Sequence, residues 1–265
     1  MSADLVEYTL RGRVAVIRFA NPPVNSLGLA LRRSLAAALE RMTGDAAVDA
    51  AVLVGANGTF SGGADIKEFG APEAFMGPSL WSLNSMLDES TKPVVAAIEG
   101  VALGGGFELA LSCHHRVALS SAKVGLPEVK LGLLPGAGGT QRLPRIIGIE
   151  GAINVMLGGE PVPVGLFAKS PLFDAIVDAD LITTACGVAE KSAAAVAAGQ
   201  ALRRIRDAKI REPDLEGLLQ FARNTAKTAF KDYPAPLAII DCIQAAATKS
   251  FEEGIAEEQR LFKGL

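Results

Sequence analysis

The segment from residue 102 to residue 108 reads ALGGGFE, and its three consecutive glycines constrain what the chain can do at this point. Glycine has no Cβ, so a ligand can approach the backbone closely, and amides at the start of the helix expected at 107–112 are free to act as donors. Glu108 would lie in the first helical turn, where the helix dipole favours a carboxylate even without a catalytic role. On local evidence, a structural and a functional interpretation are equally open.

A second glycine-rich segment precedes it, at residues 60–68, and reads FSGGADIKE. Asp65 and Glu68 have the spacing of a capping box for a short helix. The N–H of Ala64 would lie near the helix start, where it has no intrahelical acceptor and could point at a developing anion. Taken alone, a capped surface turn is the simpler interpretation.

Two further segments follow, LPE at residues 126–128 and PGAGGTQR at residues 135–142. Pro127 fixes one backbone dihedral and biases Leu126 towards an extended conformation, which suits Glu128 at a strand–loop junction. The longer segment combines a rigid turn, three glycines and polar residues before a helical run at 143–147. Each is ordinary in isolation: a surface glutamate and a tight packing turn.

Outside these segments, the hydrophobic pattern alternates between the period of strands and that of helices. We expect strands at 14–19, 51–54 and 94–98, with helical stripes at Leu31, Leu35, Leu39 and Met42, and at Leu80, Leu83 and Leu87. This alternation is typical of layered α/β proteins. From about residue 189 the chain is alanine-rich and has no convincing strand. We therefore expect a catalytic core at 1–188 and a helical C-terminal region at 189–265.

Composition excludes several classes of function. The 265 residues carry a net charge of −3, which gives no general attraction to nucleic acid or to acidic membranes. No uncharged stretch of the chain reaches the roughly 20 residues that span a bilayer. The charged N-terminus lacks the apolar core of a secretory signal, and three scattered cysteines favour a reducing compartment. We expect a cytoplasmic location with neither nucleic-acid nor membrane partners.

Taken together, the four segments resemble the crotonase (enoyl-CoA hydratase/isomerase) superfamily in order and spacing, from Asn21 to Gly148. The resemblance implies a spiral of β-β-α units. It also implies an oxyanion hole formed by the N–H groups of Ala64 and Gly105, which would receive a thioester carbonyl and stabilise its enolate. The substrate would be an acyl-CoA thioester. No separate cofactor or metal is expected, because coenzyme A is part of the substrate.

Hydratases of this superfamily hold one water between two glutamates, and Glu108 and Glu128 stand at the matching positions. The resemblance implies that Glu128 donates a proton to Cα, that Glu108 activates the water, and that the Gly136 N–H helps to position it. Two nearby carboxylates disfavour simultaneous ionisation, so one can stay protonated near neutral pH. The remaining predicted substrate-binding residues flank the two glycine loops: Gly62, Gly63, Asp65, Ile66, Lys67 and Gly104.

Other assignments are weaker. Neither glycine cluster completes a dinucleotide-binding fingerprint, which argues against a nicotinamide dehydrogenase. Adjacent Cys113, His114 and His115 look metal-like, but they would point in different directions on a helix, and we expect structural histidines. An Δ3-Δ2 enoyl-CoA isomerase needs only one carboxylate and remains an alternative. A catalytically silent acyl-CoA-binding scaffold is a third hypothesis, against which the retention of both glutamates argues.

Some features leave their role open. The basic stretch at 203–211 could meet coenzyme A phosphates or another protein, although a solvated helix face is the simpler interpretation. Phe69, Trp81 and Leu83 could line an acyl tunnel or fill the core. The tail from 232 to 262 resembles the region after the N-terminal hydratase module of multifunctional fatty-acid oxidation proteins. This predicts a following 3-hydroxyacyl-CoA dehydrogenase module, while the superfamily in general forms trimers or hexamers.

Overall fold

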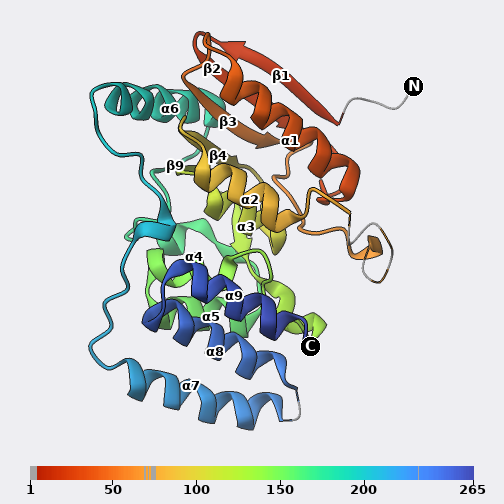
Figure 1. Ribbon diagram of the computed structural model, residues 1–265, viewed down its shortest axis with the longest axis vertical. Helices are drawn as coiled ribbons and strands as arrows, with labels where there is room; N and C mark the ends of the chain where they lie inside the picture. The colour runs from red at the N-terminus through yellow and green to blue at the C-terminus, as the bar shows by residue number, and fades with distance from the viewer. Residues whose placement is uncertain (1–4, 69, 71, 73–75, 232) are drawn as a thin grey trace.

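A computed structural model of the protein describes residues 5–68, 70, 72, 76–231 and 233–265. Its main feature is a six-stranded sheet in the order β1-β2-β3-β4-β6-β9 (Figure 1). β1 pairs antiparallel with β2, and all the other neighbours are parallel. The strands are β1 (Val6–Arg11), β2 (Val14–Phe19), β3 (Ala50–Gly55), β4 (Val94–Ile98), β6 (His115–Leu119) and β9 (Ala175–Val177).

Helices cover both faces of this sheet, and the sequence of the central strands explains why. β3 and β4 are buried along their whole length and carry only apolar residues or glycine, as expected for strands covered on two sides. In β2, Ile17 packs into the larger core with α1 (Leu29–Gly44), whereas Val16 packs on the other face with α6 (Leu181–Ala197). The predicted α/β class is confirmed.

A second, three-stranded sheet has the order β5-β7-β8 and lies where the glycine-rich loops converge. Its strands are β5 (Val101–Leu103), β7 (Lys123–Gly125) and β8 (Val162–Pro163). β4, β5 and α3 (Gly105–Ser112) follow one another along the chain, as do β6, β7 and α4 (Gly139–Ile147). These repeats are the β-β-α units expected from the sequence, and Ser61 joins the small sheet through a bridge to Ala102.

The helices after α6 gather beyond α4 at the end of the molecule opposite β1 (Figure 1). α8 packs against α4, α5, α7 and α9, and α9 also contacts α4. The remaining helices are α2 (Leu80–Glu89), α5 (Ile149–Gly158), α7 (Leu215–Phe230), α8 (Ala235–Thr248) and α9 (Phe251–Phe262), with short 3-10 turns η1 (Ile66–Glu68), η3 (Pro127–Leu131), η4 (Val164–Phe167) and η5 (Ile205–Asp207).

The predicted boundary between residues 188 and 189 falls inside α6, a helix that packs on β3, β4 and β6. The division into a core and a C-terminal region stays a prediction. In the described part of the chain, no helix is both long enough and apolar enough to cross a membrane.

Candidate active site

The glycine-rich loops and both predicted glutamates surround one cavity of about 310 Å³. Nine of the eleven predicted site residues line it: Gly62, Gly63, Ala64, Ile66, Gly104, Gly105, Glu108, Glu128 and Gly136. Asp65 and Lys67 do not line it. Lys67 is exposed, and its N–H bonds to the Asp65 carboxylate at 3.1 Å, which forms a local turn. Segments more than 70 residues apart in sequence are thus brought to one site.

The amides of Ala64 and Gly105 lie side by side at the start of α3. A Cβ built on Gly105 would lie 3.3 Å from the Ala64 nitrogen and would collide with the Leu80 side chain. Gly104 turns the chain into the helix with φ +49°, a conformation that favours glycine. Within the described residues, neither amide has a hydrogen-bond acceptor. Two N–H donors therefore remain available at the cavity wall.

Glu68, expected in a capping box, does a different job. Its Oε1 accepts the Leu29 N–H at 2.5 Å, and its Oε2 accepts from the Arg32 guanidinium at 2.7 Å. Leu29 is the first residue of α1, so Glu68 caps that helix instead of its own 3-10 turn. The spacing alone could not show this, because the partner lies 39 residues away. The loop that carries Ala64 is consequently tied to the sheet-covering helix.

Glu108 is 2% exposed and rests on backbone donors. Its Oε1 accepts the N–H groups of Ala137 and Gly139, each at 2.8 Å. Burial raises the pKa of Glu108, while these two N–H groups and the Arg142 charge oppose that rise. A Cβ on Gly139 would lie 2.8 Å from the same oxygen, so glycine is needed there for the close approach. Donors that surround a carboxylate favour its ionised form.

Glu128 has the opposite environment. Its Oε2 is buried, and within the part of the chain that the structure describes it has no hydrogen-bond partner. Burial raises the pKa of Glu128 well above its ordinary value, and the charge of Glu108 raises it further. The pKa of both carboxyl groups is raised, but Glu128 is held further towards its protonated form, because only Glu108 has backbone donors from other residues and a cation that oppose the rise. Such a division is the usual sign of paired acid and base roles.

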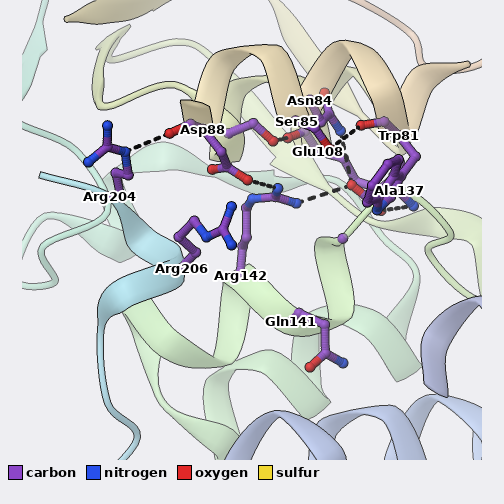
Figure 2. A network of polar contacts seen from close by, with 12 residues as sticks. Trp81, Asn84, Ser85, Asp88, Glu108, Ala137, Gln141, Arg142, Arg204 and Arg206 are labelled. Atoms are coloured by element: carbon purple, nitrogen blue, oxygen red, sulfur yellow. Dashed lines mark hydrogen bonds and ion pairs between the residues drawn. The ribbon is translucent and has the colours of Figure 1, made fainter. Parts of the chain in front are cut away.

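A buried ion pair supports the Glu108 side of the site. Arg142 pairs with Asp88 and also donates to the Ala137 carbonyl at 3.2 Å, as Figure 2 shows. Asn84 donates to the same carbonyl at 2.9 Å. Two donors thus fix the Ala137 carbonyl in place, which helps to hold the residue whose N–H binds Glu108.

Sequence reasoning missed the contribution of α9. Phe262 lines the cavity and packs against Gly136, where a Cβ would lie 2.7 Å from its ring. Glu258, one turn earlier, is fully buried and binds the loop beside Glu108. Residues four apart share one helix face, so the two side chains reach the site together, but the burial of Glu258 cannot be read from the sequence. Leu80, Leu131, Leu133 and Leu134 complete the apolar wall.

The remaining candidate residues have structural contacts. His114 is buried, accepts the Val94 N–H at 3.0 Å, and burial lowers its pKa to about 3. His115 lies between Asp174 and Ser192, at 2.8 and 2.9 Å. No group of three or more metal-binding side chains occurs among the described residues.

Trp81 lines the cavity, whereas Leu83 is a core residue and Phe69 lies outside the described residues. The expected solvated helix at 203–211 is wrong. Only η5 is helical there, and the arginines bind the chain instead: Arg203 contacts Asp174, and Arg204 donates to the Asp88 carbonyl (Figure 2). The guanidinium groups satisfy backbone carbonyls that this irregular segment faces.

Two neighbouring backbone amides and two carboxyl groups of unequal character thus surround one cavity in an α/β fold. This arrangement is typical of enzymes that act on carbonyl groups. The sequence matches the enoyl-CoA hydratase/isomerase family over residues 9–235, and the chain belongs to that family. The predicted crotonase-type fold and family are confirmed.

Relatives and solved structures agree with this membership. The peroxisomal bifunctional enzyme of Danio rerio is 42% identical over 255 residues, covering 95% of this chain and 34% of its own length. The glyoxysomal fatty acid β-oxidation multifunctional protein MFP-a of Cucumis sativus is 36% identical, with 95% and 36% covered. Enoyl-CoA hydratase from Mycobacterium tuberculosis superposes with a TM-score of 0.66 at 28% identity, covering 97% and 96%.

The chain spans about a third of the length of these curated relatives. Their names correct one expectation: the predicted cytoplasmic location is wrong, because the relatives are peroxisomal or glyoxysomal enzymes. Three free cysteines argue against a disulfide framework but do not distinguish one reducing compartment from another. Organelle addresses are short signals read by receptors, which composition does not reveal.

Proposed function

We propose that this chain is an enoyl-CoA hydratase that adds water across the 2,3 double bond of a 2-enoyl-CoA, giving a 3-hydroxyacyl-CoA in fatty-acid β-oxidation. The thioester carbonyl would accept hydrogen bonds from the N–H groups of Ala64 and Gly105. These donors stabilise the negative charge that develops on oxygen as water attacks Cβ. Loss of one such donor typically costs about 100- to 1000-fold in rate.

Glu108 and Glu128 would divide the proton transfers. Glu108, favoured in its ionised form by the Ala137 and Gly139 amides, accepts a proton from the water that attacks Cβ. Glu128, whose pKa burial raises well above its usual range, donates a proton to Cα. The Gly136 N–H would help to hold the water, and Gly62, Gly63, Asp65, Ile66, Lys67 and Gly104 would contact the substrate. The reaction is redox-neutral, and we propose that it needs no separate cofactor.

The observation that carries this proposal is that two glutamates with different environments, the buried Glu108 and the half-buried Glu128, line one cavity. The test is to add crotonyl-CoA and follow the loss of absorbance from its conjugated double bond. Wild-type protein should hydrate crotonyl-CoA, and the double variant Glu108→Gln/Glu128→Gln should bind the thioester without turnover. Absence of turnover in folded wild-type protein over a range of acyl lengths would reject hydration.

Isomerisation is a second candidate, and one observation favours it. The unpartnered Oε2 of Glu128 is a single proton-carrying group that could serve two carbons of one substrate. A 3-enoyl-CoA would then gain conjugated absorbance upon incubation. Glu108→Gln should spare this activity while removing hydration, because only hydration requires a group to activate water.

We further propose that the chain is the N-terminal hydratase module of a longer fatty-acid oxidation protein. The support is that it spans about a third of bifunctional and multifunctional relatives. A dehydrogenase module would follow and oxidise the 3-hydroxyacyl product. Sequencing the native reading frame tests the fusion, and light scattering of the purified chain tests whether it forms the expected trimer or hexamer.

A further inference from the structure

Four consecutive residues at the start of α4 present their N–H groups alternately to two buried carboxylates. The amides of Ala137 and Gly139 bind Glu108, each at 2.8 Å. The amides of Gly138 and Thr140 bind Glu258, at 2.8 and 3.3 Å. Gly138 has φ +97°, which turns successive N–H groups to opposite sides. Each of these four N–H groups therefore has a carboxylate acceptor.

Glu258, like Glu108, is held in this position by several hydrogen bonds. It is fully buried, and its Oε2 also contacts the Thr140 hydroxyl at 2.5 Å. That hydroxyl oxygen accepts from Gln141, whose amide nitrogen also donates to the Cys242 carbonyl, so the contact is fixed on both sides. α9, which carries Glu258, begins in a capping box at Ser250. A charged group buried this deeply destabilises the fold unless hydrogen bonds or an opposite charge compensate for the lost hydration.

We infer that Glu258 is a positioning residue for the hydratase proposed above: from α9 it holds the loop whose N–H groups orient Glu108. This rests on the proposed function. Glu258 lies on the opposite side of the loop from Glu108, so it acts through the backbone and through space without touching substrate.

The electrostatics give this role a pH signature. Burial, with a smaller contribution from the Glu108 charge, raises the pKa of Glu258 to about 8. Glu258 is thus protonated below about pH 8 and charged above it. Its charge is in turn one cause of the raised Glu128 pKa. The titratable and charged groups that face it from the surrounding elements are Glu108 of α3, Glu128 of η3, Arg142 of α4 and Cys242 of α8.

Glu258→Gln fixes the neutral state and keeps an acceptor for Gly138. We expect the alkaline limb of the kcat/KM profile, which reports loss of the Glu128 proton, to move to lower pH by about half a unit. The acid limb should not move, because Glu258 is already protonated there. Glu258→Ala leaves two buried amides without acceptors, and kcat should fall about 100-fold as Glu108 loses its orientation. Glu257→Gln, a neighbouring change on a side chain paired with Arg260, is the matched control.

Two further measurements keep the inference falsifiable. Hydrogen exchange of the Gly138 and Thr140 amides should accelerate in Glu258→Ala and not in Glu257→Gln, whether or not hydration is the reaction catalysed. If Glu258→Gln does not fold, Thr140→Val should move the alkaline limb in the same direction by a smaller amount. A folded Glu258→Gln with wild-type kcat and both limbs in place overturns the inference. Inactive wild-type protein with accelerated exchange in Glu258→Ala rejects the hydratase and leaves the loop contact standing.

Discussion

The region around Glu108 and the region around Glu128 hold the same chemical group in contrasting ways. Glu108 receives two backbone N–H groups and lies near the Arg142 charge, whereas the buried Oε2 of Glu128 has no hydrogen-bond partner among the residues that the structure describes. Both carboxyl groups are withdrawn from water, so burial alone does not distinguish them. The hydrogen-bond donors do. This contrast supports the proposed roles of Glu108 as the base and Glu128 as the acid.

The largest expected effect comes from removing either carboxylate. Glu108→Gln and Glu128→Gln should each lower kcat by about 100- to 10,000-fold, because the amide can neither accept nor donate the required proton. Thioester binding should persist. The comparison predicts a further difference, since the residual rate of Glu108→Gln should lose its acid limb and that of Glu128→Gln its alkaline limb. Near-normal turnover of either variant at saturating crotonyl-CoA would disprove that residue's role.

The next largest effect should come from the N–H donors of the proposed oxyanion hole. Gly105→Pro removes the N–H, and activity should fall about 100- to 1000-fold. Gly105→Ala keeps the N–H, and its new Cβ meets the flexible end of Leu80, so the loss should be smaller. Steady-state kinetics on both variants, with circular dichroism to verify folding, separates the donor from the added bulk. Equal activity of the two folded proteins would contradict the oxyanion-hole assignment.

Substitution of Arg142 should reduce the difference in pKa between the carboxyl groups of Glu108 and Glu128. Arg142→Met removes the nearby cation that lowers the pKa of Glu108, so the acid limb should move to higher pH. It also leaves Asp88 buried without its partner, a change that costs about 3–5 kcal/mol in comparable sites. Asp88→Asn/Arg142→Met should recover stability without returning the acid limb. An unmoved limb in the folded double variant would show that Arg142 does not act on Glu108.

The smallest effect is on stability. The folded-state pKa of Glu128 is raised above its unfolded value, so the folded protein holds a proton that the unfolded chain releases. The resulting penalty is absent at acid pH and grows as pH rises from the unfolded pKa towards the folded one. Glu128→Gln should therefore have a higher free energy of unfolding than wild type at neutral pH and the same at pH 3. Urea titrations at the two pH values measure the difference.

Much of this architecture could be predicted because its signals are local. The strand at 94–98 follows from a short continuous apolar run and the helix that carries Leu31 to Met42 from its period, and the glycine loops mark the site. Strands of three residues, such as β9, are too short to show a period, and they form only because neighbouring strands supply partners. Glu258 and Phe262 were not predicted as site residues, because their partners lie more than 100 residues away in the sequence. Tertiary contacts, not local pattern, assign them to the site.

Phe262 and Glu258 lie four residues apart on α9. This spacing links access to the cavity, which Phe262 lines, to the position of the loop that Glu258 binds. Fraying of the last turn beyond Arg260 would uncover the cavity mouth while leaving Glu258 on the loop. A rigid displacement of the whole helix would withdraw both at once. In the proposed hydratase, the first motion would let product leave while the loop stays in place, and the second would release the loop as well. The length of α9 that moves would therefore determine whether the next turnover begins with the loop already in place or only after the helix has returned to it.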